Sequence, residues 1–349
     1  MPKYVVVPGV VEVYSNVDYI PRFALGPNLF PLTSFRPCPI KIHFFVCQTF
    51  CPPPGLQNSV YPFYVGDSVV YYEHPLFGPF KLQTMISDLQ RIPKLHVNKT
   101  CFRLIQRPIG NLLPPGILCT DIIWAKLITN NMTIVHGSCI SLNDDGILIL
   151  GLSGAGKSLT AYLSQKNNFQ YLSEDITIVD EKRAYACPFT QSFLNEDLFI
   201  KTLLKDKKIG TRDYFRIISL KRVEKLLKPS LFLPFNVLTP SKIKMTESFR
   251  ENVDIKNIFI LERGTIGISE LSMEEALKRI LLLNRTEFYY DRDIFLTLYS
   301  LHNPEFKYES LLLRGKAILT KLVEKSNCFL IQTPHPSESL NLIQRCLKK

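Results

Sequence analysis

The sequence predicts an α/β protein with a β-rich N-terminal region, and three observations carry this prediction. An apolar strand, a glycine-rich loop and a helix follow one another over residues 147–163. Strand and helix patterns alternate along the C-terminal part, whereas residues 1–115 consist of short β-rich stretches broken by proline. With 46% hydrophobic and 21% charged residues, the chain of 349 residues has the composition of a globular protein that buries a large core.

The N-terminal region shows strand patterns but no recognisable chemistry. β-branched and aromatic residues concentrate over residues 10–14, 40–46 and 68–72. The histidines of this region have no partners at metal-ligand spacing, so we interpret them as ordinary packed or surface residues: His43, His74 and His96. The prolines of residues 112–116 predict a boundary, which divides the chain into residues 1–115, of unknown role, and residues 116–349.

A helix and then a β-hairpin follow this boundary. The helix is expected from about Cys119 to Asn130, with Trp124 on its core-facing side. Residues 132–142 and the strand that enters the glycine-rich loop flank the turn sequence of residues 143–146, which predicts a hairpin. If these four residues all form the turn, His136 lies opposite Ser153.

The glycine-rich loop fits the phosphate-binding pattern G-x-x-x-x-G-K-[ST] at every fixed position. Its glycines allow backbone N–H groups to point at phosphate oxygens, next to the positive end of the following helix. Lys157 is expected to contact the terminal phosphates and Ser158 to bind Mg²⁺. The predicted nucleotide site comprises Gly151, Leu152, Ser153, Gly154, Ala155, Gly156, Lys157, Ser158 and Leu159. A chance match in a plain turn is the alternative, and the strand–loop–helix setting argues against it.

Two adjacent acids, Glu174 and Asp175, interrupt a β-rich run over residues 169–180. In a strand they would point to opposite faces, so one could address the metal and the other an incoming hydroxyl. A salt-bridged strand end is an equally good interpretation. Asp180 and Glu262 each end an apolar run, as a metal-binding acid often does, but we rank both below Asp175.

The C-terminal third predicts a regular α/β scaffold. Ser272 and Glu275 form a capping box that opens a helix reaching Asn284. Residues 328–333 predict a buried strand, and Ser337 is expected to cap the last helix. The aromatic cluster of residues 288–290 could touch nucleotide or substrate, although surface packing is the simpler interpretation.

Charge and cysteine usage restrict the classes of partner. The net charge is +11, and residues 201–250 carry thirteen Lys and Arg against four acids. This basic segment is either a solvated surface or a patch for an acidic or phosphorylated partner; no nucleic-acid-binding motif is present. The nine cysteines contain no C-x-x-C pair, so neither a zinc ribbon nor a thioredoxin-type site is indicated. Their odd number, together with the lack of a signal peptide, predicts buried thiols in a reducing compartment. No signal peptide or apolar run of membrane-spanning length is found, so a cytoplasmic location and no membrane partner are expected.

The spacing of these residues resembles a known kinase family. His136-Gly137 stands fifteen residues ahead of the loop, and Glu174 and Asp175 stand seventeen and eighteen residues beyond Lys157. Over about residues 130–190 this pattern is similar to the HPr kinase/phosphorylase family, which belongs with phosphoenolpyruvate carboxykinase. The resemblance implies a P-loop kinase core with a mixed sheet, and oligomers occur in that family. It assigns His136 as the active-site histidine, Glu174 as the general base and Asp175 as the residue near the metal.

The resemblance implies an ATP- and Mg²⁺-dependent kinase that transfers the γ-phosphate to a hydroxyl, most readily a serine of a peptide or protein. The sequence departs from the family at Glu174, where the family has aspartate, and over residues 181–189, which lack the family's signature for HPr. Residues 187–189 and the tail instead resemble lasso-peptide kinases. Two alternatives remain. Adenylylsulfate kinases, which act on a small molecule, share the loop sequence, and a nucleotide-binding sensor or assembly protein would hold ATP without turnover.

Overall fold

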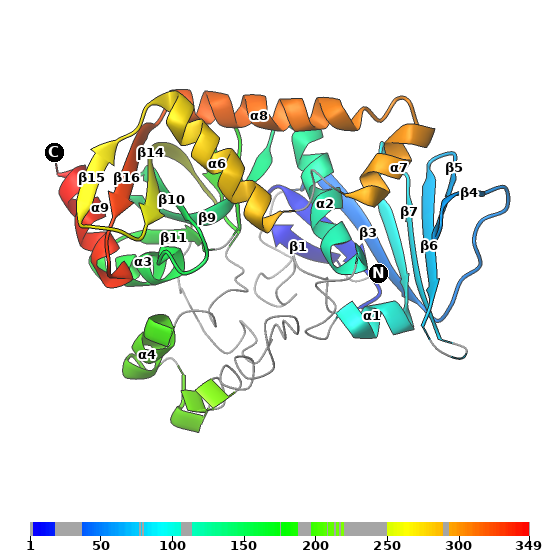
Figure 1. The fold of residues 1–349 in the computed structure, drawn as a ribbon, viewed down its shortest axis with the longest axis horizontal. Coiled ribbons are helices and arrows are strands. Elements are labelled where there is room, and N and C mark those ends of the chain that lie inside the picture. The colour runs from blue at the N-terminus through cyan, green and yellow to red at the C-terminus, as the bar shows by residue number, and fades with distance from the viewer. Residues whose placement is uncertain are drawn as a thin grey trace. The chain divides into compact units, whose positions relative to one another are not determined.

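The α/β class with mixed sheets is confirmed by a computed structural model (Figure 1). The structure describes residues 3–17, 37–76, 78, 80–105, 114–174, 176–187, 197–207, 209–212, 214–215, 218–219, 250–288 and 293–348. Its described residues form two compact units. The first draws on residues 1–129 and 289–312, and the second on residues 130–219, 240–288 and 313–349. Most of the basic segment 201–250 lies outside the described residues, so its role stays a prediction.

The first unit is built on one mixed sheet with the strand order β1-β2-β3-β8-β7-β6-β5-β4 among its described residues. The strands are β1 Lys3–Val7, β2 Val11–Ser15, β3 Ile40–Cys47, β4 Gln57–Val60, β5 Phe63–Gly66, β6 Val69–Pro75, β7 Lys81–Ser87 and β8 Lys94–Asn98. β2, β3 and β8 are parallel neighbours, and the other pairs are antiparallel. β2, β3 and β6 confirm the strands expected at 10–14, 40–46 and 68–72.

Within the part of the chain that the structure describes, three helices belong wholly to this unit: α1 Lys99–Ile105, α2 Pro114–Thr129 and α7 Ile294–His302. α2 starts earlier than the helix expected from Cys119, because proline is well tolerated in the first turn, where its missing N–H has no partner to lose. Trp124 of α2 is buried and meets the ring of Tyr308 edge to face, with ring centroids 6.3 Å apart. The expected role of Trp124 in core packing is therefore confirmed.

A buried carboxyl pair joins α2 to α7. Asp293 is the N-cap of α7, where its side chain accepts a hydrogen bond of 2.7 Å from the backbone N–H of Leu296. Its side chain also shares a hydrogen bond with Asp121 of α2, and both residues are buried. Burial raises the pKa of Asp293 above its ordinary value of 3.8, against the effect of these hydrogen bonds. A shared hydrogen bond between two carboxyl groups requires one proton.

We expect Asp293→Asn to gain stability relative to the wild type as the pH rises from 4 to 7. A raised pKa contributes stability that is complete below the unfolded-state value near 3.8 and is lost as the pH rises through the folded-state value. Asparagine keeps the N-cap acceptor and offers Asp121 a donor at every pH. Urea midpoints at pH 4 and pH 7 measure the effect, with exposed Asp67→Asn as control. An identical stability difference at both pH values would contradict it.

The second unit contains the other mixed sheet. Its strands are β9 Thr133–Leu142, β10 Asp145–Gly151, β11 Gln170–Ser173, β12 Ile176–Val179, β13 Arg183–Tyr185, β14 Asn252–Glu262, β15 Gly267–Glu270 and β16 Asn327–Gln332. β10 is antiparallel to β9 and parallel to β14, and β14 is parallel to β16. β9 pairs with β12, β12 pairs with β13, and β13 pairs with β14. Because β10 pairs with both β9 and β14, these five strands form a closed ring. β16 confirms the strand expected at 328–333.

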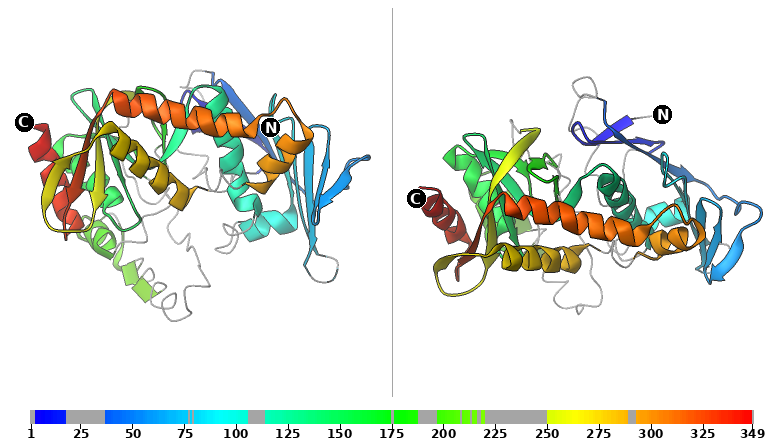
Figure 2. Two further views of the ribbon diagram at one scale, coloured as in Figure 1. Left: turned by 45° about the horizontal axis from the view of Figure 1, so that its top comes forward. Right: turned by 90° about the horizontal axis from the view of Figure 1, so that it is seen from above.

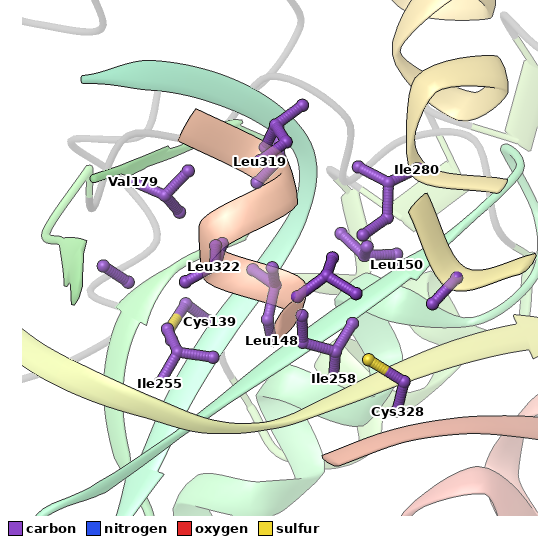
Figure 3. Close-up of a cluster of buried hydrophobic side chains, with 14 of the residues drawn as sticks. Cys139, Leu148, Leu150, Val179, Ile255, Ile258, Ile280, Leu319, Leu322 and Cys328 are labelled. Atoms are coloured by element: carbon purple, nitrogen blue, oxygen red, sulfur yellow. The ribbon is translucent and has the colours of Figure 1, made fainter. Parts of the chain in front are cut away.

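Helices cover both faces of this sheet (Figures 1 and 2). They are α3 Lys157–Ser164, α6 Met273–Glu287, α8 Tyr308–Glu324 and α9 Ser339–Leu347, of which α8 begins in the first unit. Another helix, α4 Asp197–Lys205, is followed by Asp206, whose carboxylate accepts a hydrogen bond of 2.7 Å from the Tyr162 hydroxyl of α3. Figure 3 shows Ile280 of α6 and Leu319 and Leu322 of α8 packed over Leu148 and Leu150 of β10. Ile147 and Ile149, which alternate with Leu148 and Leu150 along β10, belong to the core on the other face of the sheet, together with residues of α3 and α9. Because both faces are covered, the strand that enters the loop is apolar at consecutive positions.

Helix ends agree with the sequence at α6 and differ at α9. The Ser272 hydroxyl accepts a hydrogen bond of 3.2 Å from the backbone N–H of Glu275, so the predicted cap is confirmed. The cap predicted at Ser337 is wrong, because a 3₁₀ turn over Pro336–Glu338 comes first and α9 begins at Ser339. Proline favours this tight turn at its first position. Among the described residues, no helix has the length and apolarity needed to cross a membrane.

Candidate phosphate-binding and catalytic site

The β9–β10 hairpin sets the register of the candidate site. Its turn contains two residues, Asn143 and Asp144, whose φ angles are +49° and +72°. Both central residues of a type I′ hairpin turn need positive φ, which asparagine and aspartate tolerate. The predicted four-residue turn is therefore wrong. Gly137 pairs with Leu150, so His136 comes level with Gly151 at the start of the loop, and not with Ser153 as expected.

Gly137 leaves no room for a side chain. A Cβ atom there would lie 2.3 Å from Cδ2 of Leu150 and 2.6 Å from the carbonyl oxygen of Ile149. The hydroxyl of Thr177 also donates a hydrogen bond of 2.8 Å to the carbonyl oxygen of Gly137. The glycine after His136 therefore allows β9 to approach the loop strand closely, a packing requirement that supplements its place in the His-Gly motif.

The phosphate loop joins the end of β10 to the start of α3, as the sequence predicts. Gly154 and Gly156 have φ angles of +81° and +103°, in the region that favours glycine. A Cβ atom on Gly156 would lie 2.6 Å from Cβ of Pro336. Leu152 and Ser153 at the tip are exposed, whereas Ala155 and the residues after it are buried. The end of the loop next to α3 is thus packed against Pro336, and its tip is exposed to solvent.

Lys157 and Ser158 occupy the first turn of α3. The Lys157 side chain turns back over the loop, where its Nζ donates hydrogen bonds of 2.7 Å to the Gly151 carbonyl and 3.2 Å to the Leu152 carbonyl. Both residues are buried, with 5% and 9% of their surface exposed. The first N–H groups of a helix have no intrahelical partner. These N–H groups, an ammonium and a hydroxyl are the donor set that a polyphosphate with its metal ion requires, so the residues present fit such a group.

His136 lies in β9, one strand away from Gly151, and is 4% exposed. Its backbone N–H donates a hydrogen bond of 2.9 Å to the Asn284 side chain, whose Nδ2 donates in turn to the Ile134 carbonyl at 3.0 Å. Asn284 therefore pairs with the edge of β9 at the point where β10 has ended. The ring of Phe288 meets the imidazole edge to face, with centroids 6.4 Å apart. The end of α6 thus fixes the position of the histidine.

Glu174 lies between β11 and β12 and is fully buried. Its backbone carbonyl accepts a hydrogen bond from the Ser138 hydroxyl, two residues after His136. Ile176, two residues further along, pairs directly with His136. Because Glu174 is in a bend and not within a strand, the predicted division of the two acids between opposite strand faces does not apply. Asp175, the predicted metal ligand, lies outside the described residues.

The two rival acids have different surroundings. Asp180 is a turn residue, because Oδ1 accepts hydrogen bonds from the N–H groups of Lys182 and Arg183 and Oδ2 accepts one of 2.6 Å from the Tyr185 hydroxyl. Asp180 lies four residues beyond Ile176, the residue that pairs with His136, which is about 13 Å along the chain at 3.3 Å per residue. The Asp180 carboxylate therefore has a structural role, which is to stabilise the turn that joins β12 to β13.

Glu262 comes closer to the loop than the sequence ranking suggests. Its neighbour Leu261 pairs with Gly151 on the parallel strand β14, so Glu262 follows at the edge where the loop begins. An ion pair with Arg279 of α6 holds the carboxylate, and Arg279 also binds Glu275 at 2.7 Å. Within the described residues, no group of three or more His, Cys, Asp or Glu forms a metal site. Mg²⁺ commonly takes only one or two protein ligands beside phosphates and water.

Sequence reasoning missed the part played by Arg263. This exposed residue follows Glu262, and its guanidinium donates hydrogen bonds of 2.8 Å to the carbonyl oxygens of Gly154 and Pro334. It therefore ties the tip of the phosphate loop to the turn after β16. The only sequence signal was an arginine after an apolar strand, a pattern too common to be informative.

No family model matches the sequence, and no curated protein matches it. The kinase interpretation therefore depends on the motif spacing and on the positions of the described side chains.

Proposed function

We propose that the protein is an ATP-dependent kinase with a P-loop core of the HPr-kinase/phosphoenolpyruvate-carboxykinase type. The observation that carries the proposal is the junction of β10 and α3, where Lys157 and Ser158 are buried at the loop and His136 comes level with its first residue. A phosphate loop alone also occurs in proteins that only hold nucleotide. The buried histidine and the neighbouring Glu174 favour chemistry at this site.

Each residue has a role in the proposed transfer of the γ-phosphate to a hydroxyl. The loop N–H groups and Lys157 bind the phosphates and neutralise their charge, with Ser158 and Asp175 as ligands of Mg²⁺. ATP supplies the phosphoryl group, and Mg²⁺ stabilises the negative charge that develops during its transfer. Glu174 accepts the hydroxyl proton, and His136 orients that carboxylate. General-base catalysis of this kind contributes about 10²–10⁴ in rate.

The acceptor class that fits the resemblance is a serine of a peptide or protein. Incubating the purified protein with γ-labelled ATP and separated peptide and small-molecule fractions of its host tests this. Label in a peptide as acid-stable phosphoserine supports the proposal, and label in a small compound instead supports the small-molecule kinase. ATP that stays bound and intact for hours with every fraction would contradict kinase activity and favour a nucleotide-binding sensor.

A further inference from the structure

The first unit holds a cavity of about 1080 Å³ that has no part in the proposed phosphoryl transfer. It is lined by the segment after β3, by β5, β6 and β7, and by the start of α1. Every lining residue belongs to this unit. Small-molecule sites commonly have volumes of about 300–1,000 Å³. The cavity is therefore large enough for a complete small ligand.

A buried polar network fixes the floor of the cavity. Nε2 of Gln83 donates hydrogen bonds of 2.7 Å to the Phe50 carbonyl and 2.9 Å to the Tyr71 hydroxyl. Oε1 of Gln83 accepts hydrogen bonds of 3.3 Å from the Phe50 N–H and from Asn98. Gln83, Tyr71 and Asn98 are all buried. Because these bonds join the segment after β3 to three strands, a ligand would bind a preorganised wall at little ordering cost.

The charges around the cavity favour an anion. Lys81 is neutralised by Glu73, with Nζ 2.7 Å from Oε1. Although burial raises the pKa of Glu73, the hydrogen bond from Lys81 and two others lower it below its ordinary value, so this carboxylate is ionised at neutral pH. Lys99 and Arg103 also line the cavity and form no ion pair or side-chain hydrogen bond within the described part of the chain. As far as the described residues show, these two positive charges are therefore available to a ligand.

Aromatic rings supply a further part of the wall. Phe50 and Tyr64 flank the buried ring of Tyr71, with centroid distances of 5.8 Å and 5.9 Å. Phe80 also lines the cavity and is 51% exposed. Flat apolar groups pack well against such rings. Guanidinium groups bind phosphate and carboxylate through paired hydrogen bonds, which an ammonium group reinforces as a point charge.

We propose that this cavity binds a small aromatic phosphate or carboxylate. The anionic group binds Lys99 and Arg103, and the planar body packs between the rings of Phe50, Tyr64 and Phe80. The site lies in a unit separate from the phosphate loop and does not depend on kinase activity.

Calorimetric titration with 1-naphthyl phosphate tests the proposal in the full chain and in its Lys157→Ala variant. We expect one saturable binding site in the wild type and in the Lys157→Ala variant, because the proposed site does not include the phosphate loop. Lys99→Gln/Arg103→Gln is expected to weaken binding at least tenfold. Arg91→Gln/Lys307→Gln removes the same charge from exposed positions of the same unit outside the cavity and should bind as the wild type does.

Three further probes separate the contributions to binding. Inorganic phosphate and 1-naphthol should each bind more weakly than 1-naphthyl phosphate, and 1-naphthoate identifies whether a carboxylate is accepted. Melting temperatures of all variants show whether they fold. The proposal is overturned if the cavity variant binds as tightly as the control variant, if binding disappears in Lys157→Ala, or if 1-naphthol binds as tightly as the phosphate.

Discussion

Lys157→Ala is expected to lower ATP turnover by about 10²–10³, the usual loss when one preorganised charge or donor is removed from a transition-state site. Its ammonium lies over the loop, bonded to the Gly151 and Leu152 carbonyls, and can exchange these acceptors for phosphate oxygens. Turnover of labelled ATP measures the rate, and equilibrium binding of ATP measures the affinity, which should fall too.

The control for this variant is Lys256→Ala, an exposed lysine on β14 that removes the same charge from the same unit. Its turnover and ATP affinity should match the wild type. Because Lys157 also bonds to its own loop, melting temperatures of both variants are compared. Wild-type turnover by a folded Lys157→Ala variant would refute the role of this lysine in the phosphate site.

Glu174→Gln is expected to lower phosphoryl transfer by about 10²–10⁴, the range that general-base catalysis contributes, while ATP binding stays near the wild-type value. Glutamine keeps the shape of the buried side chain but cannot accept a proton at neutral pH. The backbone at this position is held by the Ser138 hydroxyl, which the substitution leaves intact. Single-turnover transfer and ATP affinity, measured on the same preparation, separate the two effects.

Exposed Glu251→Gln serves as the matched control, since it removes one carboxylate from the same unit without touching β9 or the loop. If Glu174→Gln transferred phosphate at the rate of this control, another group would have to be the base. Asp175→Ala separately tests the metal ligand, because that role predicts loss of turnover together with a higher Mg²⁺ concentration for half-maximal rate.

Local signals in the sequence were sufficient for much of the fold. The strand before the loop, the glycines and the Ser272 cap each depend on neighbouring residues, so apolar runs and capping patterns predict them. The predictions that failed were also local, but they concerned alternatives of similar energy. Residues 143–146 are compatible with a two-residue or a four-residue turn, and Ser337 with a cap or a 3₁₀ turn. The backbone preferences of single residues decide between these alternatives, because Asn143 and Asp144 tolerate positive φ and Pro336 favours the first position of a 3₁₀ turn.

The sequence by itself determined that a loop with the phosphate-binding pattern links a buried strand to a helix, and it placed a histidine and an acidic pair at fixed spacings from that loop. Only the tertiary structure decided that His136 comes level with Gly151, that Asn284 holds it from 148 residues away, and that Arg263 and Pro336 contact the loop. The physical reason is the distance along the chain over which each kind of interaction acts. Turns, caps and periodicity act over a few residues, whereas these contacts exist only once the sheet and its helices have packed together.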